Sequence, residues 1–346
     1  MRVPLYGMLG LSLLIAHPAA AQEAAPPPET TVVTDEEGVI EMDTVVVAGV
    51  QPGPGLWKVR HGDHLMYVLG TQSPLPKNMT WRSDEVTQAL QLADEVLGSP
   101  GVTVNADVGF FRGLTMLPSA LKAAKNPDGE KLEDVLPADL YARWSVLKQR
   151  YLGRDGGIEK KRPLIAVYEL YGKALSKSGL QGAGSVINPV VDDVLKARRM
   201  KRTPTQLKIM LDDPRGALAD FRKEGLKPQD LECFRKTLDL IENELPQSTA
   251  SARAWAVGDW AAIRYTGARW TGTRRLQLGV VRYRHGAQAR HARHRGPRAR
   301  AVDGYRGSFP AKNRITFATI SVWDLVRPDG YLAALQAKGY EVEAPE

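Results

Sequence analysis

The 346-residue sequence has a single cysteine, Cys233, and therefore cannot form an intramolecular disulfide bond. The fold must hold together without covalent cross-links, whichever compartment the protein occupies. After the first 21 residues, no apolar run is long enough to cross a membrane. The sequence also lacks a phosphate-binding loop and the Gly-x-Gly-x-x-Gly pattern of dinucleotide-binding folds. The lack of further cysteines excludes a disulfide scaffold. The lack of both motifs removes the usual sequence evidence for a nucleotide-binding enzyme.

The composition is that of a folded protein. Hydrophobic residues make up 43% of the chain and charged residues 25%, which excludes a wholly disordered chain and a collagen.

The N-terminus has the three parts of a secretory signal peptide. Arg2 provides the positive charge, residues 8–16 form the apolar stretch, and Ala19 and Ala21 give the small-x-small pattern that precedes a cleavage site. We expect cleavage between Ala21 and Gln22. The mature protein would then be periplasmic or secreted, without a transmembrane anchor.

Residues 22–54 have the composition of a flexible linker. Three consecutive prolines at 26–28 are followed by acidic residues and by two further prolines, Pro52 and Pro54. Within this linker, residues 45–47 are compatible with one edge strand. The folded domain is therefore expected to span residues 55–346.

Residues 264–308 have an anomalous charge. Between 264 and 306 there are 12 arginines, no lysine, three histidines and one acidic residue, Asp303. That stretch carries a formal charge of +11. Because the whole chain carries +8, the remainder of the chain carries −3. The basic character of the protein is thus confined to one segment, and we do not expect nucleic acid as a partner.

Three interpretations of this basic segment remain open. It is a basic arm for an anionic polymer, a metal-binding tract built on His285, His291 and His294, or a stretch of codons read out of frame. The last is favoured, because the preceding helical pattern stops near Arg264 and regular periodicity returns only after residue 308. Burial of so many arginines would be costly, so we expect the segment to be poorly ordered.

The apolar pattern elsewhere predicts an α/β fold. Runs at 56–60 and 66–70 flank a Gly-Asp turn and predict a β-hairpin. Further strands are expected at 95–97, 206–210 and 340–342, and a buried strand is expected at 315–321. Between them the periodicity is helical, with helices expected at 83–93, 108–124, 137–152, 162–179, 189–200, 213–224, 228–244 and 248–263 and, near the C-terminus, at 329–338. The Gly-Ala-Gly at 182–184 is interpreted as a loop. We predict one domain whose central sheet joins the N- and C-terminal segments around a long helical middle.

Several short motifs, in order, resemble the TraB/GumN family, which is related to the Tiki metalloproteases. The motifs are Gly-Leu-Trp-Lys-Val at 55–59, Tyr-Val-Leu-Gly-Thr at 67–71, Pro-Leu-Pro at 74–76, the helix from Trp81 to Asp94, Ala-Trp at 254–255 with Gly-Asp at 258–259, and the C-terminal stretch from Phe317 to Tyr340. The resemblance is greatest to short secreted members from bacteria with GC-rich genomes.

This resemblance implies an α/β fold with two Gly-x-x-His motifs, an acidic residue and an arginine that together hold a divalent metal such as Mn or Co. In this sequence the first motif reads Gly70-Thr71-Gln72-Ser73, and the second corresponds to Ser321-Val322-Trp323-Asp324. Ser73 and Asp324 therefore occupy the two histidine positions. The acidic position corresponds to Ser99, and the arginine falls within the basic segment.

With these ligands replaced, we predict an envelope protein with a non-catalytic or accessory binding role and no cofactor. Its partner would be an envelope protein, a peptide or a polymer. Two alternatives stay open: a metal-dependent peptidase or hydrolase of the Tiki type with relocated ligands, and a basic-arm binder of an anionic polymer.

Overall fold

The computed structural model describes residues 33–34, 40–41, 49–106, 109–211, 213–267 and 313–345. The predicted signal peptide, most of the predicted linker and residues 268–308 of the basic segment lie outside these ranges. The chain divides into two units, Met1–Asp43 and Thr44–Glu346. In the first unit, two short strands, β1 (Val33–Thr34) and β2 (Ile40–Glu41), pair in antiparallel fashion.

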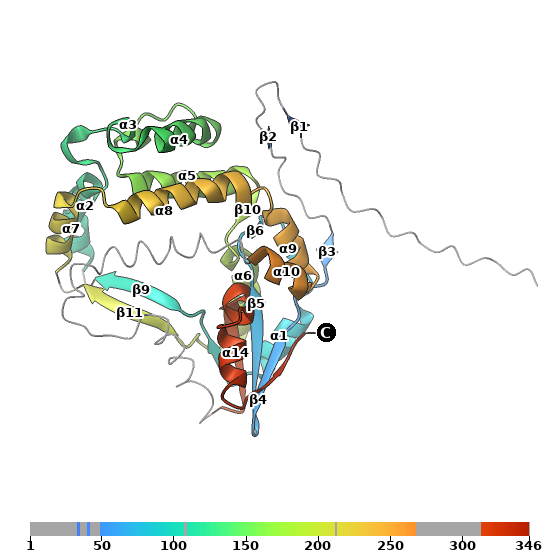
Figure 1. Cartoon of the computed structure of the whole chain (residues 1–346). Helices are drawn as coiled ribbons and strands as arrows, with labels where there is room; N and C mark the ends of the chain where they lie inside the picture. The colour runs from blue at the N-terminus through green and yellow to red at the C-terminus, as the bar shows by residue number, and fades with distance from the viewer. Residues whose placement is uncertain are drawn as a thin grey trace, which may run out of the picture. The chain divides into compact units, whose positions relative to one another are not determined.

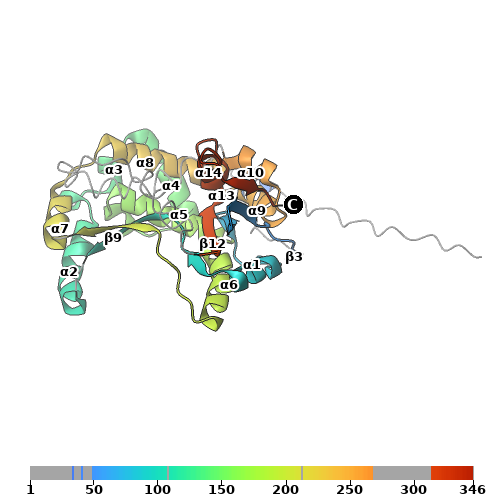
Figure 2. The ribbon, with the colours of Figure 1, turned by 90° about the horizontal axis from the view of Figure 1, so that it is seen from below.

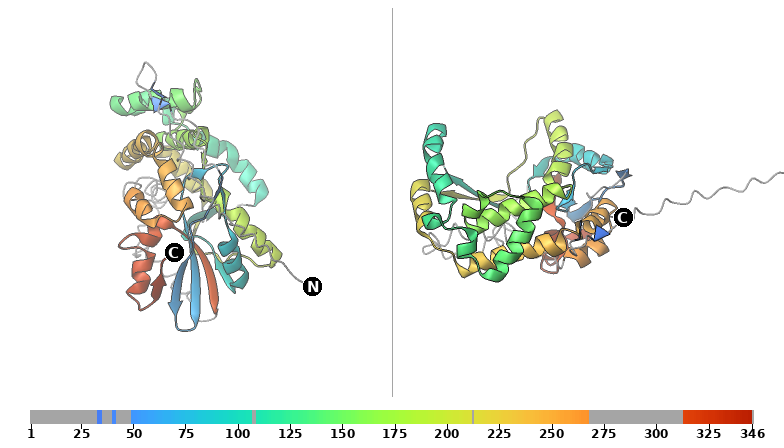
Figure 3. Two further views of the ribbon diagram at one scale, coloured as in Figure 1. Left: turned by 90° about the vertical axis from the view of Figure 1, so that its right-hand side faces the viewer. Right: turned by 90° about the horizontal axis from the view of Figure 1, so that it is seen from above.

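The centre of the second unit is a five-stranded sheet in the order β13-β4-β5-β12-β8. Its strands are β13 (Glu341–Glu343), β4 (Trp57–His61), β5 (His64–Thr71), β12 (Ile315–Ser321) and β8 (Glu95–Leu97). β12 runs parallel to both β5 and β8, with Tyr67 opposite Phe317. Figures 1 and 3 show the blue N-terminal strands beside the red C-terminal strand. The predicted joining of the two chain ends in one sheet is confirmed.

Both faces of this sheet are buried, as the near-continuous apolar runs of β5 and β12 require. On one face Leu69 and Phe317 pack with residues of α1 (Asp84–Leu92), α6 (Gly184–Ala197) and α9 (Ser248–Ala256). On the other face Val68 and Ile320 pack with α13 (Val322–Val326) and α14 (Tyr331–Gln336). Figure 2 shows α1 and α6 on one side of β12 and α13 and α14 on the other.

The middle of the chain is mainly helical, as predicted. Its helices are α2 (Phe110–Ala123), α3 (Leu132–Val135), α4 (Ala138–Tyr151), α5 (Pro163–Lys177), α7 (Pro214–Lys223), α8 (Pro228–Asp239), which continues as a π-helical turn at Leu240–Glu244, and α10 (Trp260–Gly267). Trp144 of α4 and Phe234 of α8 are fully buried against each other, with ring centroids 5.7 Å apart. None of the helices in the described ranges combines the length and apolar character that a membrane span requires.

A second, smaller sheet was not predicted in full. The expected strand at 206–210 exists as β11 (Gln206–Leu211), but its parallel partner β9 (Gly101–Ala106) was not foreseen. Two shorter pairs complete the strands: β3 (Val50–Gln51) with β7 (Thr80–Trp81), and β6 (Leu75–Pro76) with β10 (Leu180–Gln181). Thus β3 brings the last residues of the predicted linker onto the folded unit.

Two helix boundaries differ from the sequence-based prediction. The helix expected at 189–200 begins at Gly184, so Pro189 lies inside it and the Gly-Ala-Gly stretch is not a plain loop. The single helix expected at 248–263 is two helices, because Gly258 adopts a φ of 71° between α9 and α10. Such a left-handed conformation is open to glycine and ends the first helix. α10 then continues into the first residues of the basic segment.

Candidate functional site

A pocket of about 400 Å³ lies where the three parallel strands β5, β12 and β8 end. Parallel strands bring their carboxyl ends to the same edge of a sheet, which is where open α/β folds bind ligands. The volume falls in the range of small-molecule sites. The position and size of the pocket make it the candidate site of this protein.

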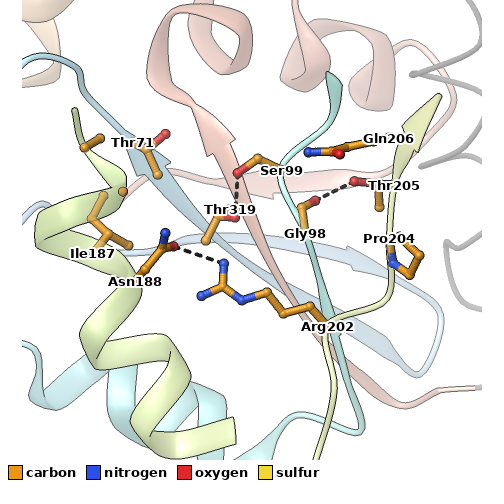
Figure 4. Close-up of a pocket in the computed structure, with 12 residues that line it drawn as sticks. Thr71, Gly98, Ser99, Ile187, Asn188, Arg202, Pro204, Thr205, Gln206 and Thr319 are labelled. Atoms are coloured by element: carbon orange, nitrogen blue, oxygen red, sulfur yellow. Dashed lines mark hydrogen bonds between the residues drawn. The ribbon is translucent and has the colours of Figure 1, made fainter. Parts of the chain in front are cut away.

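The lining comes from strand ends, from the start of α6 and from the segment that leads into β11. It comprises Thr71, Gly98, Ser99, Ala183, Gly184, Ile187, Asn188, Arg202, Pro204, Thr205, Gln206 and Thr319. Six of these twelve residues carry a hydroxyl or an amide on their side chains, and Figure 4 shows how the lining surrounds the pocket. Among the described residues that line the pocket there is no histidine, cysteine or carboxylate, and Arg202 is the one charged residue among them.

The strand side of the pocket is a hydrogen-bonded wall of hydroxyl groups. Thr319 lies opposite Leu69 in the register of β12 and β5, so its side chain is on the same face as the α1 and α6 core. Its hydroxyl lies 2.9 Å from that of Ser99, as Figure 4 shows. Next to this pair, the Thr205 hydroxyl donates to the carbonyl of Gly98 at 2.6 Å. These bonds tie the end of β8 to β12 and to the approach to β11.

The helical side of the pocket is organised by Arg202. Its guanidinium donates to the Asn188 side-chain oxygen at 3.1 Å and to Asp192 at 2.7 Å, both on α6. The ion pair with Asp192 offsets the charge of Arg202, so the pocket is close to neutral. A Cβ at Gly184 would lie 3.0 Å from the Asn188 amide nitrogen, so a larger residue there would require the Asn188 side chain to shift slightly.

The positions predicted from the two motifs are dispersed around the pocket. Ser73 is exposed and lies beside the start of α6. Its hydroxyl accepts a hydrogen bond of 3.4 Å from the backbone N–H of Ala183. Gly70 lies on the opposite face of the sheet, and a Cβ there would be 3.3 Å from the Trp260 ring. Ser321 ends β12. None of these three residues is in the pocket lining.

Asp324 also lies away from the pocket. It is only 2% exposed within α13, and its carboxylate is 3.7 Å from the Arg327 guanidinium. Its carboxylate is thus close to the Arg327 guanidinium just after α13, and Asp324 is not part of the pocket lining.

Sequence reasoning identified Ser99 as a replaced acidic position, and the structure places it in the pocket beside Thr319. Thr319 was missed, although a polar residue within an otherwise apolar buried strand is a usable signal. Asn188 and Arg202 left no such signal, because a polar residue on a helix or in a loop is usually a surface residue. Among the residues that the structure describes, no three histidine, cysteine, aspartate or glutamate side chains gather in a way that could hold a metal ion.

Fold and site together define an α/β protein whose sheet unites the two ends of the domain and whose pocket lies at the carboxyl ends of its parallel strands. The chain belongs to the TraB/PrgY/gumN family, whose model matches residues 55–344. The match covers the whole sheet and the helical middle. No curated protein and no solved structure shows a significant match to the chain.

Proposed function

We propose that this family member is an exported, non-catalytic binding protein whose pocket takes an uncharged polar ligand. The ligand would be an amide- or hydroxyl-bearing part of an envelope peptide or polymer. The observation that carries the proposal is the pocket lining, in which Thr71, Ser99, Thr319 and Gln206 present hydrogen-bonding groups and Arg202 is already paired with Asp192.

The donor set does not fit the divalent metal that the family resemblance implies. Manganese and cobalt sites in proteins are built from imidazole and carboxylate ligands, and the lining offers hydroxyl and amide groups instead. Because no described residue of the lining is a general base or an activated nucleophile, the geometry favours binding over hydrolysis.

Export is supported by the sequence alone. Arg2, the apolar stretch at 8–16 and Ala19-x-Ala21 match the pattern that a signal peptidase recognises. A binding role in the envelope also suits a pocket that recognises amides and hydroxyls, since these groups are abundant in peptides and saccharides.

A metal titration tests the non-catalytic part of the proposal. Isothermal titration of the full chain with Mn²⁺, Co²⁺ and Zn²⁺ should show no stoichiometric site of micromolar affinity. A site of that affinity that disappears in Asp324→Ala would show that relocated ligands hold a metal, and the metal-dependent hydrolase would then be the better description.

A ligand titration tests the binding part. Two uncharged probes, N,N′-diacetylchitobiose and acetyl-trialanine amide, separate a saccharide from a peptide ligand by saturation-transfer NMR. We expect saturable binding of one probe at millimolar concentration or below, weakened by Ser99→Ala and by Thr319→Val. Ser145→Ala, on α4 outside the pocket, is the matched control and should leave binding unchanged. If neither probe saturates, or if all three variants behave alike, the pocket is not the binding site for such a ligand.

A further inference from the structure

Helix α2 (Phe110–Ala123) exposes an unusual amount of apolar surface. Leu114, Leu117 and Leu121 are 51%, 52% and 61% exposed, and Phe111 near the start of the helix is 80% exposed. With 3.6 residues per turn, these four positions fall within about one third of the helix circumference. They therefore form one continuous face, which we call the α2 apolar face. An exposed apolar face of this kind marks an interaction site.

Within the part of the chain that the structure describes, this face stays exposed, because α2 is held from its other side. Met116 and Ala123, which are buried, lie nearly opposite the α2 apolar face around the helix. Arg215 of α7 donates a hydrogen bond of 3.1 Å to the Thr115 hydroxyl and fixes the two helices side by side. The helix is thus apolar on two opposite faces, one of which packs within the protein and one of which does not.

The charge around α2 indicates what the face would meet. Residues 109–125 contain Arg112, Lys122 and Lys125 and no acidic residue, whereas the chain outside the basic segment is acidic on balance. Lys122 and Lys125 are exposed at the C-terminal end of the helix, beside the last leucine of the face. An apolar helix face with cationic flanks is typical of helices that lie in the interface of an anionic bilayer.

We propose that α2 docks the protein onto an anionic lipid surface, with the α2 apolar face among the acyl chains and Lys122 and Lys125 against the headgroups. A second copy of the chain fits this face less well. Antiparallel pairing of two α2 helices would bring the Arg112 end of one helix to the lysine end of the other, where like charges repel. A bilayer accepts a convex apolar ridge without needing a shaped counterpart.

A spin label placed on the face tests the proposal directly in the full chain. The labelled variants are Leu121→Cys/Cys233→Ser and the matched control Val146→Cys/Cys233→Ser, since Val146 on α4 is 60% exposed. Both are mixed with vesicles of phosphatidylglycerol and phosphatidylcholine. We expect the residue 121 label to gain oxygen collisions and lose collisions with a nickel chelate, whereas the residue 146 label stays accessible to water.

The charge requirement is tested with the same label at residue 121. Lys122→Glu/Lys125→Glu should weaken its vesicle binding by at least about tenfold, and pure phosphatidylcholine vesicles should bind less. Lys196→Glu/Lys201→Glu, two exposed lysines elsewhere, should change binding by less than about twofold.

Two results would overturn the proposal. One is a label at residue 121 that stays accessible to water in the presence of anionic vesicles. The other is spin–spin broadening of that label without vesicles, which would show that a second copy covers the face. Neither result depends on ligand binding in the pocket.

Discussion

Replacing Trp255 by phenylalanine tests how the end of β5 is held. Trp255 is fully buried, and its indole N–H donates to the carbonyl of Gly70 at 2.7 Å. Gly70 directly precedes Thr71, which lines the pocket. The substitution removes this donor and leaves a smaller ring in the same site.

The expected cost has two parts. Loss of the donor to a buried carbonyl costs about 1–2 kcal/mol, and the smaller ring costs about 1–2 kcal/mol through lost burial and the cavity it leaves. We expect the free energy of unfolding to fall by about 2–4 kcal/mol, the sum of these two effects.

Trp57→Phe is the matched control. Trp57 is 4% exposed, and its indole nitrogen has no hydrogen-bond partner among the described residues. Its replacement should cost no more than the ring contribution, about 1–2 kcal/mol, because it also removes a buried donor that has no partner. The difference between the two variants therefore reports the indole N–H groups, one bonded to Gly70 and one unbonded.

Urea denaturation followed by circular dichroism measures both variants without relying on tryptophan fluorescence. The difference between Trp255→Phe and Trp57→Phe should be about 1–2 kcal/mol. If the two losses agree within about 0.5 kcal/mol, the bond does not hold the end of β5, and the reasoning about this strand is wrong.

Three further predictions concern the core, the cysteine and the N-terminus. Phe317→Ala, at the fully buried centre of β12, should lower the free energy of unfolding by about 3–5 kcal/mol in the same assay; a loss below about 1 kcal/mol would contradict the joined sheet. Burial, reinforced by the nearby Asp230 carboxylate, raises the pKa of the Cys233 thiol to about 11. Because only the thiolate reacts, alkylation by iodoacetamide should be slow at pH 8 and accelerate up to about pH 11 while the protein stays folded, and a rate that levels off near pH 9 would count against that pKa. Mass spectrometry of the protein from an exported fraction should find Gln22 at the N-terminus, whereas a cytoplasmic protein that keeps Met1 would show that the signal is not used.

Local patterns were sufficient for the sheet and most of the helices. The apolar runs at both chain ends are too short to bury themselves separately, and this predicted a common sheet before its register was known. The motifs at 67–71 and 317–340 likewise carried the family resemblance. Each of these signals lies within a single segment. It can therefore be recognised before the positions of the other segments are known.

The pocket was decided by tertiary structure. Ser99 and Thr319 are distant in the sequence, yet their hydroxyls are 2.9 Å apart because β8 and β12 are neighbours in the sheet. Arg202 contributes to the same pocket only because α6 and the approach to β11 run side by side there. β9 was missed for the same reason, since a strand whose parallel partner lies about a hundred residues away is stabilised by that partner rather than by its own sequence. The sequence by itself therefore determined the family, the fold class and the strands of the central sheet, and only the folded chain decided which polar side chains meet at their ends.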